Sequence, residues 1–146
     1  MLATTAGDVQ MMNCLDRADR YPVGATTDEA DPEDLDALVL PGGVANPNPL
    51  RLEFVTALFE AGRPTAVICH GPWTLVKAGL VDGRTLTSWP SLQIDIRYAG
   101  GNWVDQEVVV CASGPNAFVT SRKPDDLPAF YNTFIEEFAK AGNDEA

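Results

Sequence analysis

Short apolar runs and a helical pattern alternate through the middle of the chain. Residues 37–40 (ALVL) form an apolar run that stops at Pro41, and residues 65–68 (TAVI) form a second run after Pro64. Runs of this length without polar alternation predict strands that are buried on both faces, as in a parallel sheet. Between them, the apolar residues of 50–61 recur at spacings near three and four, which predicts an amphipathic helix. The order strand, helix, strand indicates an α/β fold.

The pattern continues with further helices and strands. Residues 73–78 are predicted as a helix that ends at Gly79, and residues 91–101 (SLQIDIRYAGG) as a helix that ends in two glycines. Two strands are predicted over 107–111 and 117–121, separated by the turn residues SGPN. The alternation therefore holds from the first buried run to the second strand of this pair.

The two ends of the chain differ in pattern. Residues 8–23 show no sustained helical period, so short strands and turns are predicted there. Residues 125–141 predict a surface helix packed on the sheet. The apolar face of this helix is expected to contain Leu127, Phe130, Phe134, Ile135 and Phe138. Without repeats or linkers, residues 1–146 are expected to form a single domain.

Composition narrows the classes of function. The chain has 146 residues, 45% of them hydrophobic, which is enough for one core. A formal net charge of −11 argues against a nucleic acid partner, because phosphate binding needs clustered Lys and Arg. No apolar run approaches the roughly 18 residues of a membrane span, and the first residues lack the basic and apolar regions of a signal peptide. We expect a soluble, cytoplasmic protein that does not bind a membrane.

The cysteines and the single histidine limit the metal chemistry. Cys14, Cys69 and Cys111 are irregularly spaced, which does not suggest a disulfide framework, so free thiols are expected. With His70 as the one histidine, no zinc site of the usual ligand spacing is predicted. Cys14 and Cys111 are interpreted as small packing residues.

Cys69 lies where a buried strand turns into a helix, in the segment AVICHGPW. Such an elbow presents a nucleophile at the carboxyl edge of the sheet, and the amides that begin the next helix lower the pKa of a thiol. Gly71 allows close backbone packing, and Pro72 suits a first helical turn. The residues by themselves leave two interpretations open, a reactive cysteine and an inert buried thiol.

Three nearby features have functional and structural interpretations. His70 is either a general base for the thiol or a structural residue that caps the helix. Gly42 and Gly43 after the first buried strand are either an oxyanion hole or a plain tight turn. Trp89 is either a residue that lines the pocket at the sheet's carboxyl edge or a core or interface aromatic residue.

Three segments together resemble the PfpI-type intracellular protease family. They are LDALVLPGGVANP (35–47), the stretch from GRPTAVICHGPW (62–73) through EVVV (107–110), and VTSRKPDDLPAF (119–130). The family belongs to the class I glutamine-amidotransferase-like superfamily, with the Parkinsonism-associated deglycases. The resemblance covers about residues 7–138, and its LPGG and ICHGP motifs are specific.

The resemblance implies a flavodoxin-like three-layer α/β sandwich with a mostly parallel sheet. It also implies no cofactor and no metal, self-association into a homodimer or hexamer, and peptidase, deglycase or glyoxalase-like activity of a stress-response enzyme. The substrate would be a small carbonyl compound or a peptide. By the same resemblance Cys69 and His70 are the catalytic pair, and the backbone amides of Gly43 and His70 form the oxyanion hole.

The chain departs from the family pattern in three places. The strand, helix and strand that usually precede the segment matching 7–13 are missing, and with them a glutamate that bonds to the thiol. The acid that follows the Gly-Gly pair in some relatives is missing as well, and Asn48 is the candidate to orient the imidazole in its place. Residues 113–117 (SGPNA) are an insertion between the last two strands. We expect the sheet to lack one central strand.

Two functions from different classes are consistent with these residues. The first is a cysteine-nucleophile hydrolase of peptidase or deglycase type, with His70 moving the proton. The alternative is a redox-sensing or chaperone-like stress protein that uses Cys69 without catalysis. Glutamine amidotransfer is disfavoured because it needs a distant histidine, and the chain has no second one.

Overall fold

A four-stranded sheet forms the centre of the computed structural model, which describes residues 1–13, 15–43 and 49–144. The strands lie in the order β5, β6, β10, β9; the first three are parallel, and β9 is antiparallel to β10. Their bounds are Leu38–Leu40 for β5, Thr65–Ile68 for β6, Val108–Cys111 for β9 and Phe118–Ser121 for β10. The four strands predicted from the apolar runs are confirmed.

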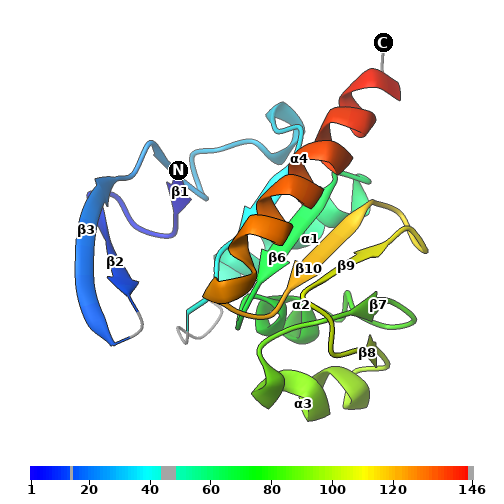
Figure 1. Ribbon diagram of the computed structural model, residues 1–146. Coiled ribbons are helices and arrows are strands. Elements are labelled where there is room, and N and C mark those ends of the chain that lie inside the picture. The colour runs from blue at the N-terminus through cyan, green and yellow to red at the C-terminus, as the bar shows by residue number, and fades with distance from the viewer. Residues whose placement is uncertain (14, 44–48, 145–146) are drawn as a thin grey trace.

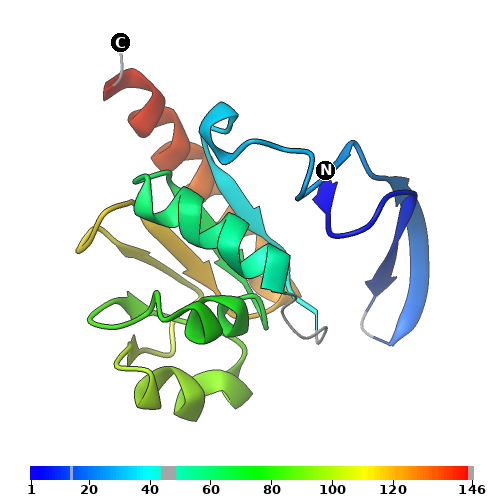
Figure 2. The ribbon, with the colours of Figure 1, turned by 180° about the vertical axis from the view of Figure 1, so that it is seen from behind.

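Helices cover both faces of this sheet (Figures 1 and 2). α4 lies across one face, and α1 and α2 lie on the other, with α3 beyond α2. The helix bounds are Pro49–Glu60 for α1, Pro72–Ala78 for α2, Gln93–Tyr98 for α3 and Leu127–Asp144 for α4. The order of layers is helix, sheet, helix, so the expected flavodoxin-like three-layer sandwich with a mostly parallel sheet is confirmed.

The side chains of β6 divide the core between these two layers. Ala66 and Ile68 pack on the α4 side with Phe130, whereas Val67 points to the α1 and α2 side, because successive side chains of a strand point to opposite faces. All four residues of β6 are buried. The strand that carries the candidate nucleophile at its end is therefore held from both faces.

Two details of the predicted burial are wrong. Val39 is 46% exposed, so β5 is not buried on both faces; among the described strands it lies at the edge of the sheet and pairs with β6. Ile135 is 60% exposed and does not belong to the apolar face of α4. Leu127, Phe134 and Phe138 of that face do pack against the core, as predicted.

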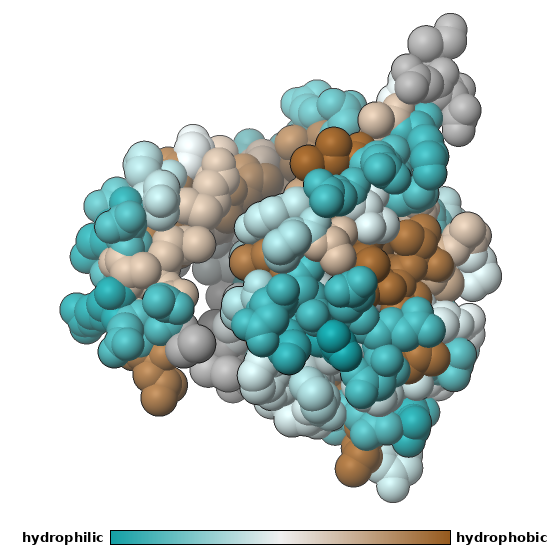
Figure 3. Space-filling model, in the orientation of Figure 1, coloured by the Kyte–Doolittle hydropathy of each residue, from teal (hydrophilic) through white to brown (hydrophobic). Residues whose placement is uncertain are grey.

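A β-hairpin stands apart from the central sheet (Figure 1), and the space-filling view shows a hollow between the two (Figure 3). It consists of β2 (Asp8–Asn13) and β3 (Asp16–Pro22), paired antiparallel, and every residue of β3 is exposed. The strands and turns predicted for 8–23 are confirmed. Nearby, β1 (Leu2–Ala3) pairs with β4 (Ala25–Thr26). The described residues before η1 (Pro32–Asp34) contain strands and turns.

A third two-stranded sheet leads to the candidate site. Its strands are β7 (Thr85–Leu86) and β8 (Asn102–Trp103), which pair in parallel. Two further short helices are η2 (Pro90–Leu92) and η3 (Pro124–Asp126). Beyond β7, the backbone amide of Thr87 donates to Thr120 Oγ1 at 2.9 Å, which ties this segment to β10 just before Trp89.

Arg84, the residue before β7, is buried in the core, and its side chain donates to the end of β9 and to the turn that follows it. Its Nη1 donates to Asn116 Oδ1 at 3.0 Å, and its Nη2 donates to the carbonyls of Asn116 and Cys111 at 2.9 and 3.1 Å. The guanidinium also lies 5.3 and 5.2 Å from the ring centroids of Phe59 and Phe118. The end of β9 and the turn that follows it therefore wrap a buried cation.

Cys111 supplies the one ionisable partner of this cation within the described part of the chain. Arg84 Nε donates to Cys111 Sγ at 3.4 Å, the Thr85 amide donates to the same sulfur at 3.4 Å, and Ser113 Oγ lies 3.1 Å from it. Burial raises the pKa of this thiol, but the hydrogen bonds from Ser113, Arg84 and Thr85 outweigh it and lower the pKa to about 7. The prediction that Cys111 is only a small packing residue was incomplete.

The lowered pKa of Cys111 predicts that the stability of the protein depends on pH. The unfolded thiol has a pKa of about 8.5 and the folded one a lower value, so the unfolded state binds more protons between pH 7 and 8.5. The stabilisation is complete above about pH 8.5 and is lost as the pH falls through about 7, with a total on the order of 2 kcal/mol. The measurement is the free energy of urea unfolding of wild type and of Cys111→Ser. We expect the difference, wild type minus variant, to rise as the pH increases from about 7 to about 8.5. A difference that stays constant from pH 6 to pH 9 would contradict the guanidinium–thiolate contact.

Candidate active site

Cys69 occupies a strained turn at the carboxyl end of β6. Its φ of 63° is the single positive φ of a non-glycine residue in the described ranges. Such a conformation costs about 1–3 kcal/mol and is held only when the surroundings fix it. The Cys69 amide donates to the Ser121 carbonyl at 3.0 Å, and the Cys69 carbonyl accepts from the Trp89 amide at 2.9 Å. These contacts hold the backbone in the sharp strand-to-helix turn that the sequence predicted.

Two glycines give this turn the space it needs. A Cβ on Gly42 would lie 2.6 Å from Cys69 Cβ, and a Cβ on Gly71 would lie 2.7 Å from Val67 Cγ1. Both distances are below any real carbon contact, so each position requires glycine. The end of β5 is thereby in direct contact with the half-buried cysteine of the neighbouring strand.

His70 faces the thiol even though the two residues are adjacent in sequence. Cys69 Sγ lies 3.2 Å from His70 Nδ1, within hydrogen-bonding range for sulfur. Burial lowers the pKa of the imidazole below its usual value, so the ring is neutral at pH 7 and Nδ1 is able to accept a proton. The geometry is that of a nucleophile and a general base.

Two tryptophans flank the imidazole. The His70 ring stacks on Trp89 with centroids 5.6 Å apart and 23° between planes, and it lies 6.3 Å from the Trp73 centroid. Both indoles are about one third exposed. Trp73 Nε1 donates to Asp95 Oδ2 at 3.1 Å, which links α2 to α3. The structure therefore brings Trp89 to the histidine, and it adds Trp73, which the sequence analysis did not select although it follows the ICHGP motif directly.

Ser91 is a further residue that sequence reasoning missed. Its Oγ lies 3.5 Å from His70 Nε2, on the ring edge away from the thiol. The two residues are 21 positions apart in the chain, and a lone serine in a turn carries no signal of such a contact. Only the fold brings them together.

The remaining predicted positions lie around the same edge of the sheet. Gly43 follows β5 with a φ of 123°, a conformation that favours glycine. Among the described residues, neither the Gly43 amide nor the His70 amide donates to a protein acceptor. Asn48 and Cys14, which the sequence analysis also named, lie outside the described residues.

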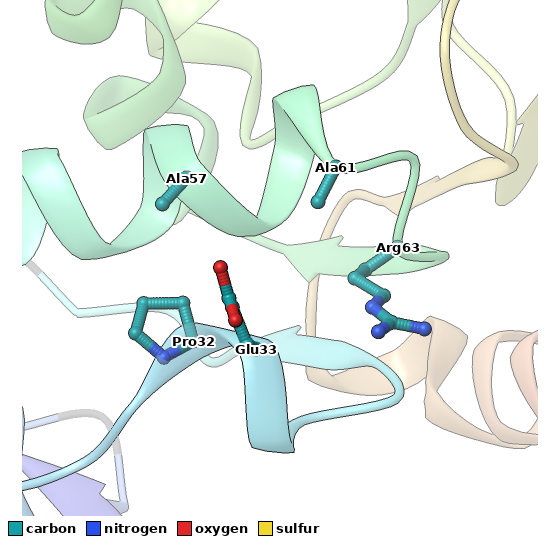
Figure 4. Close-up of a pocket in the computed structure, with 5 residues that line it drawn as sticks. All are labelled: Pro32, Glu33, Ala57, Ala61 and Arg63. Atoms are coloured by element: carbon teal, nitrogen blue, oxygen red, sulfur yellow. The ribbon is translucent and has the colours of Figure 1, made fainter.

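A separate pocket lies at the opposite end of β6 (Figure 4). It is lined by Pro32, Glu33, Ala57, Ala61 and Arg63. Arg63 precedes β6 whereas Cys69 follows it, so the pocket and the cysteine are at different edges of the sheet. In the described ranges no three His, Cys, Asp or Glu side chains are grouped to hold a metal ion. Over the same ranges, none of the helices combines the length and apolar character of a bilayer-crossing segment.

The amino-acid sequence is similar to those of several known proteins. Deglycase TK1284 of Thermococcus kodakarensis is 44% identical over 114 residues, which are 75% of this chain and 66% of the relative. General stress protein 18 of Bacillus subtilis is 42% identical over 74% of this chain and 63% of its own length. Deglycase PfpI of Pyrococcus furiosus is 43% identical over 78% of this chain and 69% of its own length. The chain spans about two thirds of the length of these relatives.

Solved structures share the fold. A two-domain protein with DJ-1/ThiJ/PfpI-like and ferritin-like domains from Anabaena variabilis superimposes with a TM-score of 0.82 and 29% identity, over 94% of this chain and 39% of that one. DJ-1 of Schizosaccharomyces pombe gives a TM-score of 0.67 at 20% identity, over 86% of this chain and 73% of that one. A family model described as DJ-1/PfpI matches residues 3–137. By sequence and by fold, this chain belongs to the DJ-1/PfpI family.

Proposed function

We propose that the protein is a cysteine-nucleophile hydrolase of the deglycase type, acting on a small aldehyde-derived adduct or a peptide carbonyl. The observation that carries the proposal is the 3.2 Å contact between Cys69 Sγ and His70 Nδ1 at a strained strand-to-helix turn. Several relatives are named deglycases, among them protein/nucleic acid deglycase 2 of Escherichia coli, which supports this substrate class. No cofactor is needed for this chemistry.

The proposed reaction begins with the transfer of a proton from the Cys69 thiol to the His70 imidazole. His70 Nδ1 takes the proton of the Cys69 thiol as the sulfur attacks the carbonyl carbon, a C–S bond forms, and the carbonyl π electrons move to the oxygen. The carbonyl then re-forms as the C–N bond breaks, and the imidazolium gives the proton to the departing nitrogen. Water hydrolyses the resulting thioester: His70 takes the water proton as the oxygen attacks, the C–S bond breaks, and the proton returns to the Cys69 sulfur. A neutral resting imidazole suits this role because its Nδ1 is free to accept.

The developing negative charge on the oxygen needs donors at the same edge of the sheet. The amides of Gly43 and His70 are our candidates, since neither donates to a described protein acceptor and both border Cys69. Trp89 and Trp73 would form apolar walls beside the reacting carbon and limit the access of water. Each of these roles is part of the proposal.

The first test removes the nucleophile. Cys69→Ser should reduce turnover of methylglyoxal adducts and of a peptide substrate at least about 10³-fold, because a serine hydroxyl is a far weaker nucleophile beside a neutral imidazole. The measurement is the rate of adduct or peptide hydrolysis, with Cys14→Ser as the matched cysteine-to-serine control. A wild-type protein with no turnover on either substrate, but with a Cys69 thiol that iodoacetamide alkylates rapidly at neutral pH, would contradict catalysis and favour the redox-sensing alternative.

The second test concerns the base. Because burial lowers the pKa of His70, the acidic limb of kcat/KM should lie below pH 6.5. His70→Gln should remove that limb and lower kcat/KM by about 10²-fold or more. The pH profile of hydrolysis measures the limb, and an NMR titration of the single histidine measures the pKa directly. An acidic limb centred above pH 6.5 would show that His70 is not the base in question.

We also propose that the chain self-associates, as a homodimer or hexamer, through the β2–β3 hairpin. The hairpin projects from the sheet, and it carries several exposed large apolar side chains: Met11 and Met12 are 37% and 53% exposed, Leu15 94% and Tyr21 50%. Apolar side chains gathered on one projecting element are typical of an interaction surface. Met12→Asp should shift the sedimentation coefficient toward that of a monomer, whereas Ile94→Asp on the exposed surface of α3 should leave it unchanged. Equal sedimentation of both variants and wild type would rule out this surface.

A further inference from the structure

The imidazole of His70 has a polar side chain at each of its two nitrogens. Nδ1 lies 3.2 Å from Cys69 Sγ, and Nε2 lies 3.5 Å from Ser91 Oγ. A neutral imidazole carries one N–H, and the group at one nitrogen decides which tautomer is favoured. For Nδ1 to accept the thiol proton, the ring hydrogen must be on Nε2, where a hydroxyl oxygen is able to accept it.

Ser91 is held where this contact requires it. The residue lies in η2, between Trp89, whose amide donates to the Cys69 carbonyl at 2.9 Å, and Leu92, which is 1% exposed. The Trp89 carbonyl accepts from the Leu92 amide at 3.0 Å, which closes the turn around Ser91. The serine is therefore fixed to the backbone of the cysteine on one side and to the core on the other.

Carboxylates do not compete for this position within the described residues. Asp95, the acid of the adjoining helix, accepts from Trp73 Nε1 at 3.1 Å, and the hydrogen-bond partners of the His70 ring are Cys69 and Ser91. A neutral hydroxyl orients an imidazole but stabilises an imidazolium less than a carboxylate does. This agrees with the lowered pKa of His70, for which burial is the cause.

We infer that Ser91 is a positioning residue, whose Oγ accepts a hydrogen bond from His70 Nε2 and so fixes the tautomer with a free Nδ1 facing the Cys69 thiol. The inference rests on the proposed function of the Cys69–His70 pair and assigns the place of an orienting acid to a serine of a different segment. Ser91 does not touch the reacting atoms. It acts through the ring, as the third group of a triad does.

NMR of ¹⁵N-histidine-labelled protein tests the tautomer directly, because the chain has one histidine and the spectrum has one pair of ring nitrogens. Above the pKa of His70, wild type and Ser91→Thr should show the proton on Nε2. Ser91→Ala should show a mixture of tautomers, and the rate of Cys69 alkylation by iodoacetamide at pH 7 should fall about fivefold in the same variant. Ile94→Ala, on the exposed part of α3, is the control and should match wild type in both measurements.

A charged variant provides a second, positive readout. Ser91→Asp places a carboxylate near Nε2 and should raise the pKa of His70 by about one unit, a tenfold change in proton affinity. Wild type with its proton on Nδ1, or a Ser91→Ala protein with unchanged tautomer and alkylation rate, would overturn the inference. Both measurements need no substrate, so a protein without turnover whose tautomer still depends on Ser91 would refute only the proposed function.

Discussion

The left-handed backbone at Cys69 is the constraint on which the rest of the site depends. A non-glycine residue with φ near 63° is maintained only by external contacts, and here they come from three directions. Ser121 of β10 and Trp89 bind the cysteine backbone, and Gly42 lies against its side chain. Because the elbow depends on the relative position of two strand ends and one later segment, the sheet must be assembled before the thiol is presented.

The same contacts determine the electrostatics of the pair. Trp89 is bound to the Cys69 carbonyl and also stacks on His70, so the residue that fixes the elbow also excludes water from the imidazole. Burial then keeps the ring neutral, which makes it a proton acceptor and not a permanent cation. A neutral imidazole is able to take a proton from the thiol that it faces.

The buried guanidinium of Arg84 supports the position of Trp89 from the other end of the segment 84–89. Arg84 is surrounded by Phe59, Phe118 and the loop that contains Asn116, and it precedes the short strand that leads to Trp89. With Cys111 as its ionisable partner, the guanidinium avoids the cost of a buried, unpaired charge. Cys111 and Asn116 thus stabilise the segment that positions the indole over the histidine.

Local pattern was sufficient to predict the elements and the strand-to-helix turn that carries the candidate nucleophile. Continuous apolar runs identified β5 and β6, helical spacing identified α1 and α4, and the residues ICHGP located the elbow, because these features depend on residues close together in the chain. Burial was predicted less well: whether β5 is an edge, and which side of α4 holds Ile135, depends on neighbours that are distant in sequence.

The completion of the site was decided by tertiary structure alone. Sequence adjacency left open whether His70 faces Cys69, and the fold answers this by stacking the ring on Trp89. Ser91 carries no motif and reaches the imidazole only because η2 is bound to the cysteine backbone. The sequence by itself determined which strand ends at the candidate nucleophile, since strand, turn and helix preferences are local. Which groups orient and desolvate its base was determined by packing between segments 20 or more residues apart, for which a single sequence contains no local signal.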